Sequence, residues 1–412
     1  MVNEYFHITN YGGTLEFYLF ELANFSVFAC LVLIIYKLGF INVNSLIVWL
    51  CLFFSPLLFN YFIFSPNLFG DQFLYAAEVM SLKTTGESYE HTQASGSLLL
   101  GSNAINPVTF TAKILGIIPL PAYMTVSSLA FANKFILFLT FLWFKRFFNS
   151  ENEVLLYFLI PSLVLYSSVG LRDTLVMVLT IIFIINLVRG RFILPILLLY
   201  PMAILKIQMF AVLTLYLVGR IIFQAHKTRN LFIFFICAIV ALVVIYQNAI
   251  LEIVNLYRLA FVAENFIGPD GTISYEAWSK YGKEEQEGLI LNSIPEVVFF
   301  AIINLPVLML IPMPWNWSNI FYPLQFIENF LLIYLYVKLT LENKLYKNYE
   351  FFLLTLMLIV GLSLYALIMA NEGTFVRYRF TLYYPFLLGL LYINNQHQNN
   401  TDGANNEKLI YK

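Results

Sequence analysis

The sequence is poor in charged residues. Only 11% of its 412 residues are Asp, Glu, Lys or Arg, and 60% are hydrophobic, whereas soluble globular domains contain about 25% charged residues. A chain of this length could not bury so much apolar surface in one water-soluble core. The shortage of charge therefore excludes a soluble enzyme and a disordered scaffold. The net charge of −1 also offers no basic surface, so we expect no nucleic acid among the partners.

Cysteine and histidine are scarce as well. The three cysteines, Cys30, Cys51 and Cys237, lie far apart in apolar runs, which indicates reduced, packed thiols and neither a disulfide framework nor a metal site. The four histidines lie in different loops, and the chain contains no Walker phosphate-binding loop. We therefore expect no metal and no cofactor.

Basic residues are missing from the first sixteen positions, which carry Glu4 and Glu16. A cleavable signal peptide would begin with a basic segment. The first apolar run, Phe17–Tyr36, is therefore interpreted as a retained membrane span.

Long apolar runs, by contrast, are abundant. A helical span needs roughly 20 apolar residues, and this criterion predicts an all-α, polytopic integral membrane protein with about eleven transmembrane helices. The predicted spans lie near residues 17–37, 42–66, 128–144, 154–170, 173–188, 192–207, 209–224, 230–248, 319–337, 350–370 and 379–394. We interpret residues 1–394 as a single transmembrane domain. The polar, Asn-rich residues 395–412 are predicted to form a disordered cytoplasmic tail.

The distribution of basic residues predicts the orientation, because Lys and Arg favour cytoplasmic loops. They place the N-terminus outside, the C-terminus in the cytoplasm, and two large loops, 67–127 and 249–294, outside. A full crossing by residues 295–313 would move Lys338 and Lys347 outside. Prolines bound that segment and interrupt helices, so we expect it to be re-entrant, which is tolerated where protein surrounds it.

One candidate catalytic residue is Asp71, in the run Gly70-Asp-Gln-Phe-Leu-Tyr75 directly after the second predicted span. A carboxylate at the outer membrane boundary can act as general base toward a sugar hydroxyl if burial raises its pKa. The alternative is a structural Asp that caps the following helix.

A second candidate is the run Ser167-Ser-Val-Gly-Leu-Arg-Asp-Thr174, between two apolar segments. Arg172 and Asp173 precede a predicted span, and a guanidinium beside a helix N-terminus suits a phosphate group. The alternative is an internal Arg172–Asp173 ion pair together with a helix cap.

Further basic residues lie on the predicted outer side. Arg377 and Arg379 in the run Asn371-Glu-Gly-Thr-Phe-Val-Arg-Tyr-Arg379 are unusual outside, and either an anionic ligand or lipid-headgroup anchoring would explain them. Lys206, at an outer turn, and Arg258, in the second large loop, could add charge to the same anion site. Lys206 could instead extend to the membrane surface.

Taken together, these motifs resemble those of known membrane enzymes. Gly70-Asp71 to Tyr75 is similar to the acidic motif in the first external loop of GT-C-type glycosyltransferases. Three other runs are similar to motifs of bacterial O-antigen and capsular repeat-unit polymerases of the Wzy type: Ser167 to Thr174, Pro312-Met-Pro-Trp315 followed by Glu328-Asn329, and Asn371 to Arg379.

The resemblance implies an inner-membrane enzyme that joins undecaprenyl-pyrophosphate-linked oligosaccharides on the periplasmic face. Arg172, Arg377 and Arg379 would bind the donor pyrophosphate, and Asp71 would activate the acceptor hydroxyl. Membrane lipid and a chain-length regulator protein would be further partners. Two alternatives stay open: a GT-C-type transferase that uses a polyprenyl-phosphate-linked sugar, and a flippase or transporter. A transporter would be expected to carry charges deep in its spans and an internal repeat.

Overall fold

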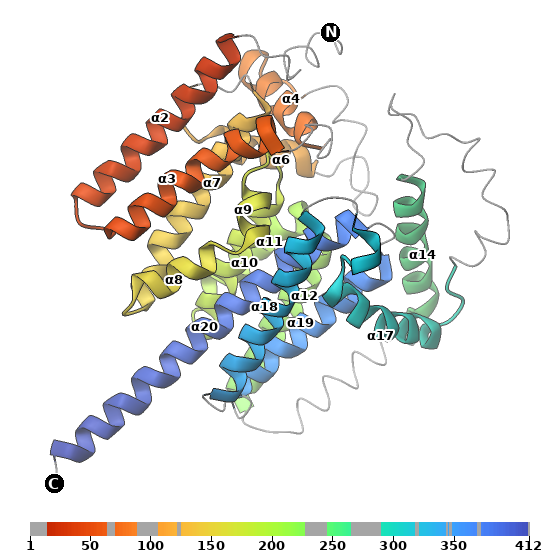
Figure 1. Cartoon of the computed structure of the whole chain (residues 1–412). Helices are drawn as coiled ribbons and strands as arrows, with labels where there is room; N and C mark the ends of the chain where they lie inside the picture. Colours follow the sequence, from red (N-terminus) through yellow and green to blue (C-terminus); the bar gives the residue numbers. More distant parts are fainter. Residues whose placement is uncertain are drawn as a thin grey trace. The chain divides into compact units, whose positions relative to one another are not determined.

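The computed structural model describes residues 15–63, 71–88, 106–121, 125–226, 245–264, 290–317, 321–342, 345, 348–368 and 372–410. Within these ranges every regular element is helical (Figure 1), and no strand is present. The prediction of an all-α fold is confirmed.

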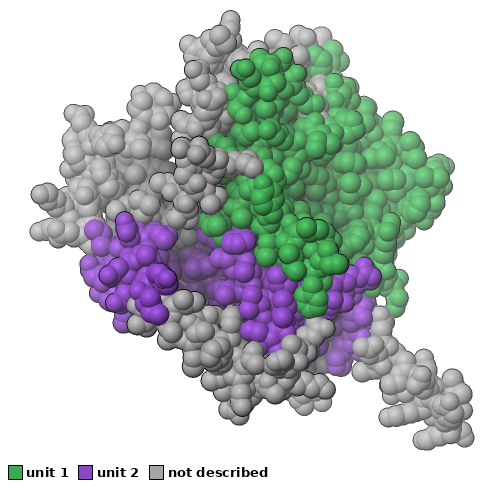
Figure 2. Space-filling view, turned by 180° about the vertical axis from the view of Figure 1, so that it is seen from behind, with its two compact units in different colours: residues 1–186, 192–207 green, residues 187–191, 208–412 purple. Residues whose placement is uncertain are grey.

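The helices form two compact units, shown in separate colours in Figure 2. Unit 1 comprises residues 1–186 and 192–207, and unit 2 comprises residues 187–191 and 208–412. The single transmembrane domain expected over residues 1–394 stays a prediction.

Unit 1 is built around α7. Its helices are α2 (Leu15–Lys37), α3 (Val43–Leu58) with the π-helical turn η1 (Phe59–Ile63), α4 (Asp71–Thr84), α6 (Pro107–Gly116), α7 (Val126–Phe144) with the 3-10 turn η3 (Lys145–Phe147), α8 (Glu151–Phe158), α9 (Pro161–Ser167), α10 (Asp173–Val188) and α11 (Ile193–Leu205). Helix α7 packs against α2, α3, α4, α8 and α9. It therefore occupies the centre of the unit.

Aromatic side chains form much of the core of unit 1. The fully buried Trp49 of α3 lies 4.9 Å from the ring of Phe138 and 5.5 Å from that of Phe141, both on α7, and 6.2 Å from that of Phe158 on α8. Such tilted and edge-on pairs are favourable beyond the area they bury. The cluster joins α3 to α7 and α8, which lie about 70 to 100 positions later in the sequence.

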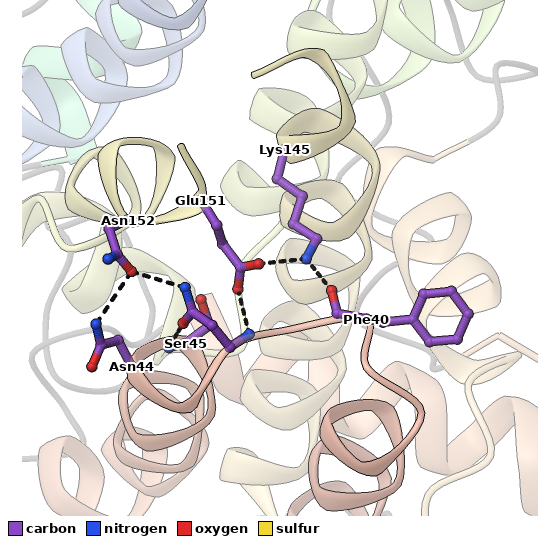
Figure 3. Close-up of polar contacts among 7 residues, drawn as sticks. Phe40, Asn44, Ser45, Lys145, Glu151 and Asn152 are labelled. Atoms are coloured by element: carbon purple, nitrogen blue, oxygen red, sulfur yellow. Dashed lines mark hydrogen bonds and ion pairs between the residues drawn. The ribbon is translucent and has the colours of Figure 1, made fainter. Parts of the chain in front are cut away.

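A polar cluster at one end of unit 1 joins the α2–α3 turn to the α7–α8 turn (Figure 3). Lys145 Nζ forms an ion pair of 2.8 Å with Glu151 Oε2 and donates to the carbonyl of Phe40. The backbone N–H of Asn42 donates to Glu151 Oε1 at 3.0 Å, and Asn42 Nδ2 donates to Asn152 Oδ1 at 3.0 Å. Glu151 therefore accepts hydrogen bonds from both turns.

Unit 2 contains α12 (Ile207–His226), α14 (Gln247–Glu264), α17 (Ile294–Leu310), the 3-10 turn η4 (Pro314–Asn316), α18 (Phe321–Glu342), α19 (Tyr349–Ile368) and α20 (Glu372–Ile410). Helix α19 packs against α14, α17 and α20. On α14, Asn255 exchanges two hydrogen bonds of 2.9 Å with the backbone N–H and carbonyl of Leu291. This pair fixes the chain just before α17 begins.

Four helical segments of the described chain are long and apolar enough to cross a membrane: Leu19–Lys37, Ser127–Phe147, Tyr322–Leu341 and Tyr349–Leu367. Five shorter apolar helices accompany them, among them Ile294–Leu310. The chain is thus a helical membrane protein by the length and composition of its helices. The count of about eleven spans, the re-entrant path of residues 295–313 and the orientation stay predictions.

Three details differ from expectation. Helix α20 continues to Ile410, where a disordered tail had been predicted from residue 395. A helix that has nucleated gains one hydrogen bond for each residue added, and no proline follows Pro385 to stop it. The predicted outer loops 67–127 and 249–294 contain helices α4, α6 and α14. The side chains of Cys30 and Cys51 are exposed rather than packed, whereas Cys237 lies outside the described residues.

Candidate functional site

The main polar feature of unit 1 is the break between α9 and α10. Helix α9 ends at Ser167 and α10 begins at Asp173, so residues 168–172, here called the α9–α10 loop, are not helical. Serine and glycine favour such breaks, and an acidic residue in the first turn of a helix is favourable. The sequence predicted this interruption correctly.

Two consecutive residues of α7 hold the loop from one side. Asn133 Nδ2 donates to the carbonyls of Val169 at 2.8 Å and Leu171 at 2.9 Å. Lys134 Nζ donates to Ser167 Oγ at 2.7 Å and to the carbonyl of Val164 at 3.0 Å. Both side chains are fully buried.

Residues from α3, η1 and α4 contact the same loop. Ser55 Oγ and Ser168 Oγ share a hydrogen bond of 2.7 Å, and Asn60 Nδ2 donates to the carbonyl of Ser168 at 3.0 Å. The backbone N–H of Gly170 donates to Gln72 Oε1 at 3.5 Å. Side chains thereby satisfy the polar groups of a loop that lies among apolar helices, as buried backbone requires.

Three charged residues lie at the end of this loop. Asp173 and Lys206 are buried, and Asp173 Oδ1 lies 3.8 Å from Lys206 Nζ. Arg172 is half-buried and directly precedes Asp173. The structure thus brings together three predicted site residues. Burying charged groups has a large desolvation cost, so charged residues in apolar surroundings indicate a functional site. Because two basic groups accompany one carboxylate here, we interpret the group as a candidate anion-binding site.

Asp71 begins α4, and its side chain lies outside the described residues. Its neighbour Gln72 contacts Gly170, so the backbone of Asp71 lies one residue away from a contact with the α9–α10 loop. The position at the start of a helix suits both interpretations of Asp71, as catalytic base and as helix cap. Its chemical role stays a prediction.

Two of the predicted site arginines of unit 2, Arg379 and Arg258, donate to carbonyls at the C-terminal ends of other helices. Arg379 Nη1 donates to the carbonyls of Leu308 at 2.9 Å, Met309 at 3.1 Å and Ile311 at 2.8 Å, at the C-terminus of α17. A cation is favourable there because the last carbonyls of a helix have no partner within it.

The other two predicted site arginines of unit 2, Arg258 and Arg377, lie on α14 and α20. Arg258 Nη1 donates to the carbonyl of Leu367 at 3.1 Å, near the end of α19, and its guanidinium lies 4.1 Å from the ring centroid of Phe300. Arg377 is half-buried, with its guanidinium 5.7 Å from the ring centroid of Tyr378. Ligand roles for Arg258, Arg377 and Arg379 stay predictions.

Asn133 and Lys134 were not predicted as site residues from the sequence. They stand as a polar pair inside the run near 128–144, and an ionisable residue within a membrane span indicates a functional site by default. Glu21 of α2 and Glu78 of α4 are also fully buried and give the same signal. Among the residues that the structure describes, no group of three or more His, Cys, Asp or Glu side chains could hold a metal ion.

No protein-family model, curated protein or solved structure matches this chain. Its function is therefore inferred from the chemistry of the site.

Proposed function

We propose that the chain is an inner-membrane polymerase that joins undecaprenyl-pyrophosphate-linked repeat units of O-antigen or capsule on the periplasmic face. The observation that carries the proposal is the placement of Arg172, Asp173 and Lys206 at the end of a loop framed by buried polar side chains. An anion bound there would meet a guanidinium, an ammonium and the N-terminus of α10.

In this proposal Arg172 and Lys206 bind the donor pyrophosphate, while Asp173 pairs with Lys206 and keeps its ammonium in place. The acceptor hydroxyl attacks the anomeric carbon of the donor as the bond from that carbon to the pyrophosphate oxygen breaks. Asp71 accepts the proton of the hydroxyl, and undecaprenyl pyrophosphate leaves with the bonding electron pair. Basic side chains stabilise its developing charge more strongly in a water-poor site than in water. Arg377 binds an anion of the same class.

A second candidate, a lipid-linked glycan flippase, is favoured by a different observation. Lys134 and Glu21 are fully buried and lie within the segments Ser127–Phe147 and Leu19–Lys37. Charged residues at depth are typical of substrate and proton pathways in transporters. The contacts of Lys134 with Val164 and Ser167 give it a structural task, and for this reason the polymerase is preferred.

The lipopolysaccharide or capsule of a deletion strain tests the proposal. A polymerase predicts surface glycan that stops at one repeat unit, with full polymer restored by the wild-type gene. Complete loss of repeats would point to the flippase or to an early transferase and overturn the proposal. An Arg146→Ala gene serves as the complementation control, because Arg146 is exposed on η3 and should restore the full polymer.

A further inference from the structure

Asn133 and Lys134 are consecutive residues of α7. The side chain of Asn133 contacts the α9–α10 loop, and that of Lys134 contacts the end of α9 just before this loop. We propose that this pair positions the α9–α10 loop, and through it Arg172 and Asp173. For the reaction, the inference rests on the proposed function, because Arg172 and Asp173 are the residues that the pair would place. For the geometry it rests only on contacts within unit 1.

Asn133 acts on the middle of the loop. Its amide nitrogen has two hydrogens, and the two carbonyls that accept them, Val169 and Leu171, flank Gly170. Two carbonyls on either side of a glycine are held to one donor group, so the bend of the backbone between them is fixed. Aspartate has nearly the same shape but no donor when ionised, and leucine has neither donor nor acceptor.

Lys134 acts on the start of the loop. Its Nζ lies at the C-terminal end of α9, where it donates to the carbonyl of Val164 and the hydroxyl of Ser167. Ser167 Oγ in turn donates to the carbonyl of Leu163. The last carbonyls of a helix have no partner within it and need donors from elsewhere. The buried Lys134 side chain therefore fixes the residue at which α9 ends.

The pair constrains the backbone up to Leu171, the residue before Arg172. Helix α10 is packed in unit 1 and cannot move together with the loop. Displacement of Leu171 would therefore change the backbone at Arg172 and with it the direction of the Arg172 side chain. Sub-ångström placement matters for catalytic groups, because a misplacement of about 1 Å can cost about 100-fold in rate. Neither Asn133 nor Lys134 needs to touch the substrate for this effect.

A cysteine cross-link measures the position of the loop without reference to activity. Ser55 Oγ and Ser168 Oγ are 2.7 Å apart, so Ser55→Cys with Ser168→Cys should form a disulfide under mild oxidation. The background carries Cys30→Ala, Cys51→Ala and Cys237→Ala. Adding Asn133→Leu should slow cross-linking by about tenfold, because two buried carbonyls lose their donors. Lys134→Met should act in the same direction, and Lys134→Arg should restore part of the rate.

The matched control is Asn186→Leu. Asn186 is also a buried asparagine of unit 1, but its Nδ2 donates to the carbonyl of Ile182 within α10. This variant should cross-link at the rate of the parent. Every variant is compared by its membrane level and its elution in gel filtration, so that unfolded protein is recognised. An unchanged cross-linking rate in folded Asn133→Leu and Lys134→Met proteins would overturn the inference.

The glycan of cells carrying the same variants separates this inference from the proposed function. Slow cross-linking together with shortened polymer supports both. Slow cross-linking with wild-type polymer still supports positioning of the loop, but it counts against the proposed function, since the loop would then lie away from the reaction. Normal cross-linking with shortened polymer overturns the inference and leaves the proposed function standing.

Discussion

Arg379 Nη1 lies 2.8 Å from the carbonyl oxygen of Ile311, the C-cap residue that directly follows α17. The same nitrogen also meets the carbonyls of Leu308 and Met309, and Asn329 Nδ2 donates to Leu310 and Ile311. Side chains from α18 and α20 thus provide the donors that the end of α17 cannot find within itself. Arg379, which was expected to bind an anionic ligand on the outer side, thus has a structural role as a donor to the end of α17.

Replacing Arg379 should therefore affect stability first. We expect Arg379→Ala to lower the free energy of unfolding by about 2 kcal/mol, because buried carbonyls lose a charged donor. Arg379→Lys should recover part of this loss. The measurement is the apparent melting temperature of the purified protein in detergent. Arg377→Ala is the control, since Arg377 is half-buried, and equal melting temperatures for the two Ala variants would contradict the capping role.

Arg172→Ala should reduce polymer about 100-fold, the loss typical when a donor that stabilises developing charge is removed. Arg172→Lys should restore only part, because an ammonium cannot reproduce the guanidinium fork on a pyrophosphate. Polymer is read from the repeat-unit ladder at equal membrane levels of protein, and Arg146→Ala is the matched variant that should keep the full ladder. A normal ladder with Arg172→Ala would mean that this arginine does not bind the donor.

Asp71→Asn separates the two interpretations of Asp71. Asparagine caps a helix about as well as aspartate but cannot accept a proton at neutral pH. A general base predicts loss of chain elongation, whereas a cap predicts a ladder of normal length, again scored at equal protein levels. Asp71→Ala removes both properties and should lower stability in either case. Normal elongation in the Asn variant would return Asp71 to a structural role.

The cluster at Glu151 predicts a loss of stability in acid. Partial burial raises the pKa of Glu151, but hydrogen bonds from Lys145 and the N–H of Asn42, together with the charge of Lys145, outweigh it and hold the pKa below its ordinary value of 4.5. The stabilisation is therefore fully present above the ordinary pKa and is lost as the pH falls through the lower, folded-state value. Between pH 7 and pH 3, the melting temperature of the wild type should exceed that of Glu151→Gln, and this difference should disappear only at the acid end of the range. A constant difference across this range would argue against the linkage.

Much of unit 1 was predictable because its signals are local. Apolar runs predict helices by their length, and the glycine, the serines and the charges of residues 167–174 predict the break between α9 and α10. These inferences need only short windows of sequence. For Lys206, the sequence left two interpretations open, added charge at the anion site or extension to the membrane surface, and its distance of 3.8 Å from Asp173 came only from the structure.

The side-chain contacts that surround the α9–α10 loop could not be predicted, because they join residues far apart in the chain. Asn133 and Lys134 contact residues 30 to 38 positions later, and Ser55 contacts Ser168 across 113 positions. The composition of α7 shows that a polar pair is present but does not show which segment it binds. Arg379 is similar: its charge was noticed, but its carbonyl partners on α17 depend on how α17 and α20 pack.

The double hydrogen bond between Asn255 and Leu291 has a consequence for chain entropy. It joins two points 36 positions apart, so the segment between them is closed at its base as soon as unit 2 folds. The entropy lost on closing a loop grows only with the logarithm of its length, about 0.6 kcal/mol for each doubling. Adding or removing a few residues between α14 and Leu291 would therefore change the free energy of unfolding of unit 2 very little.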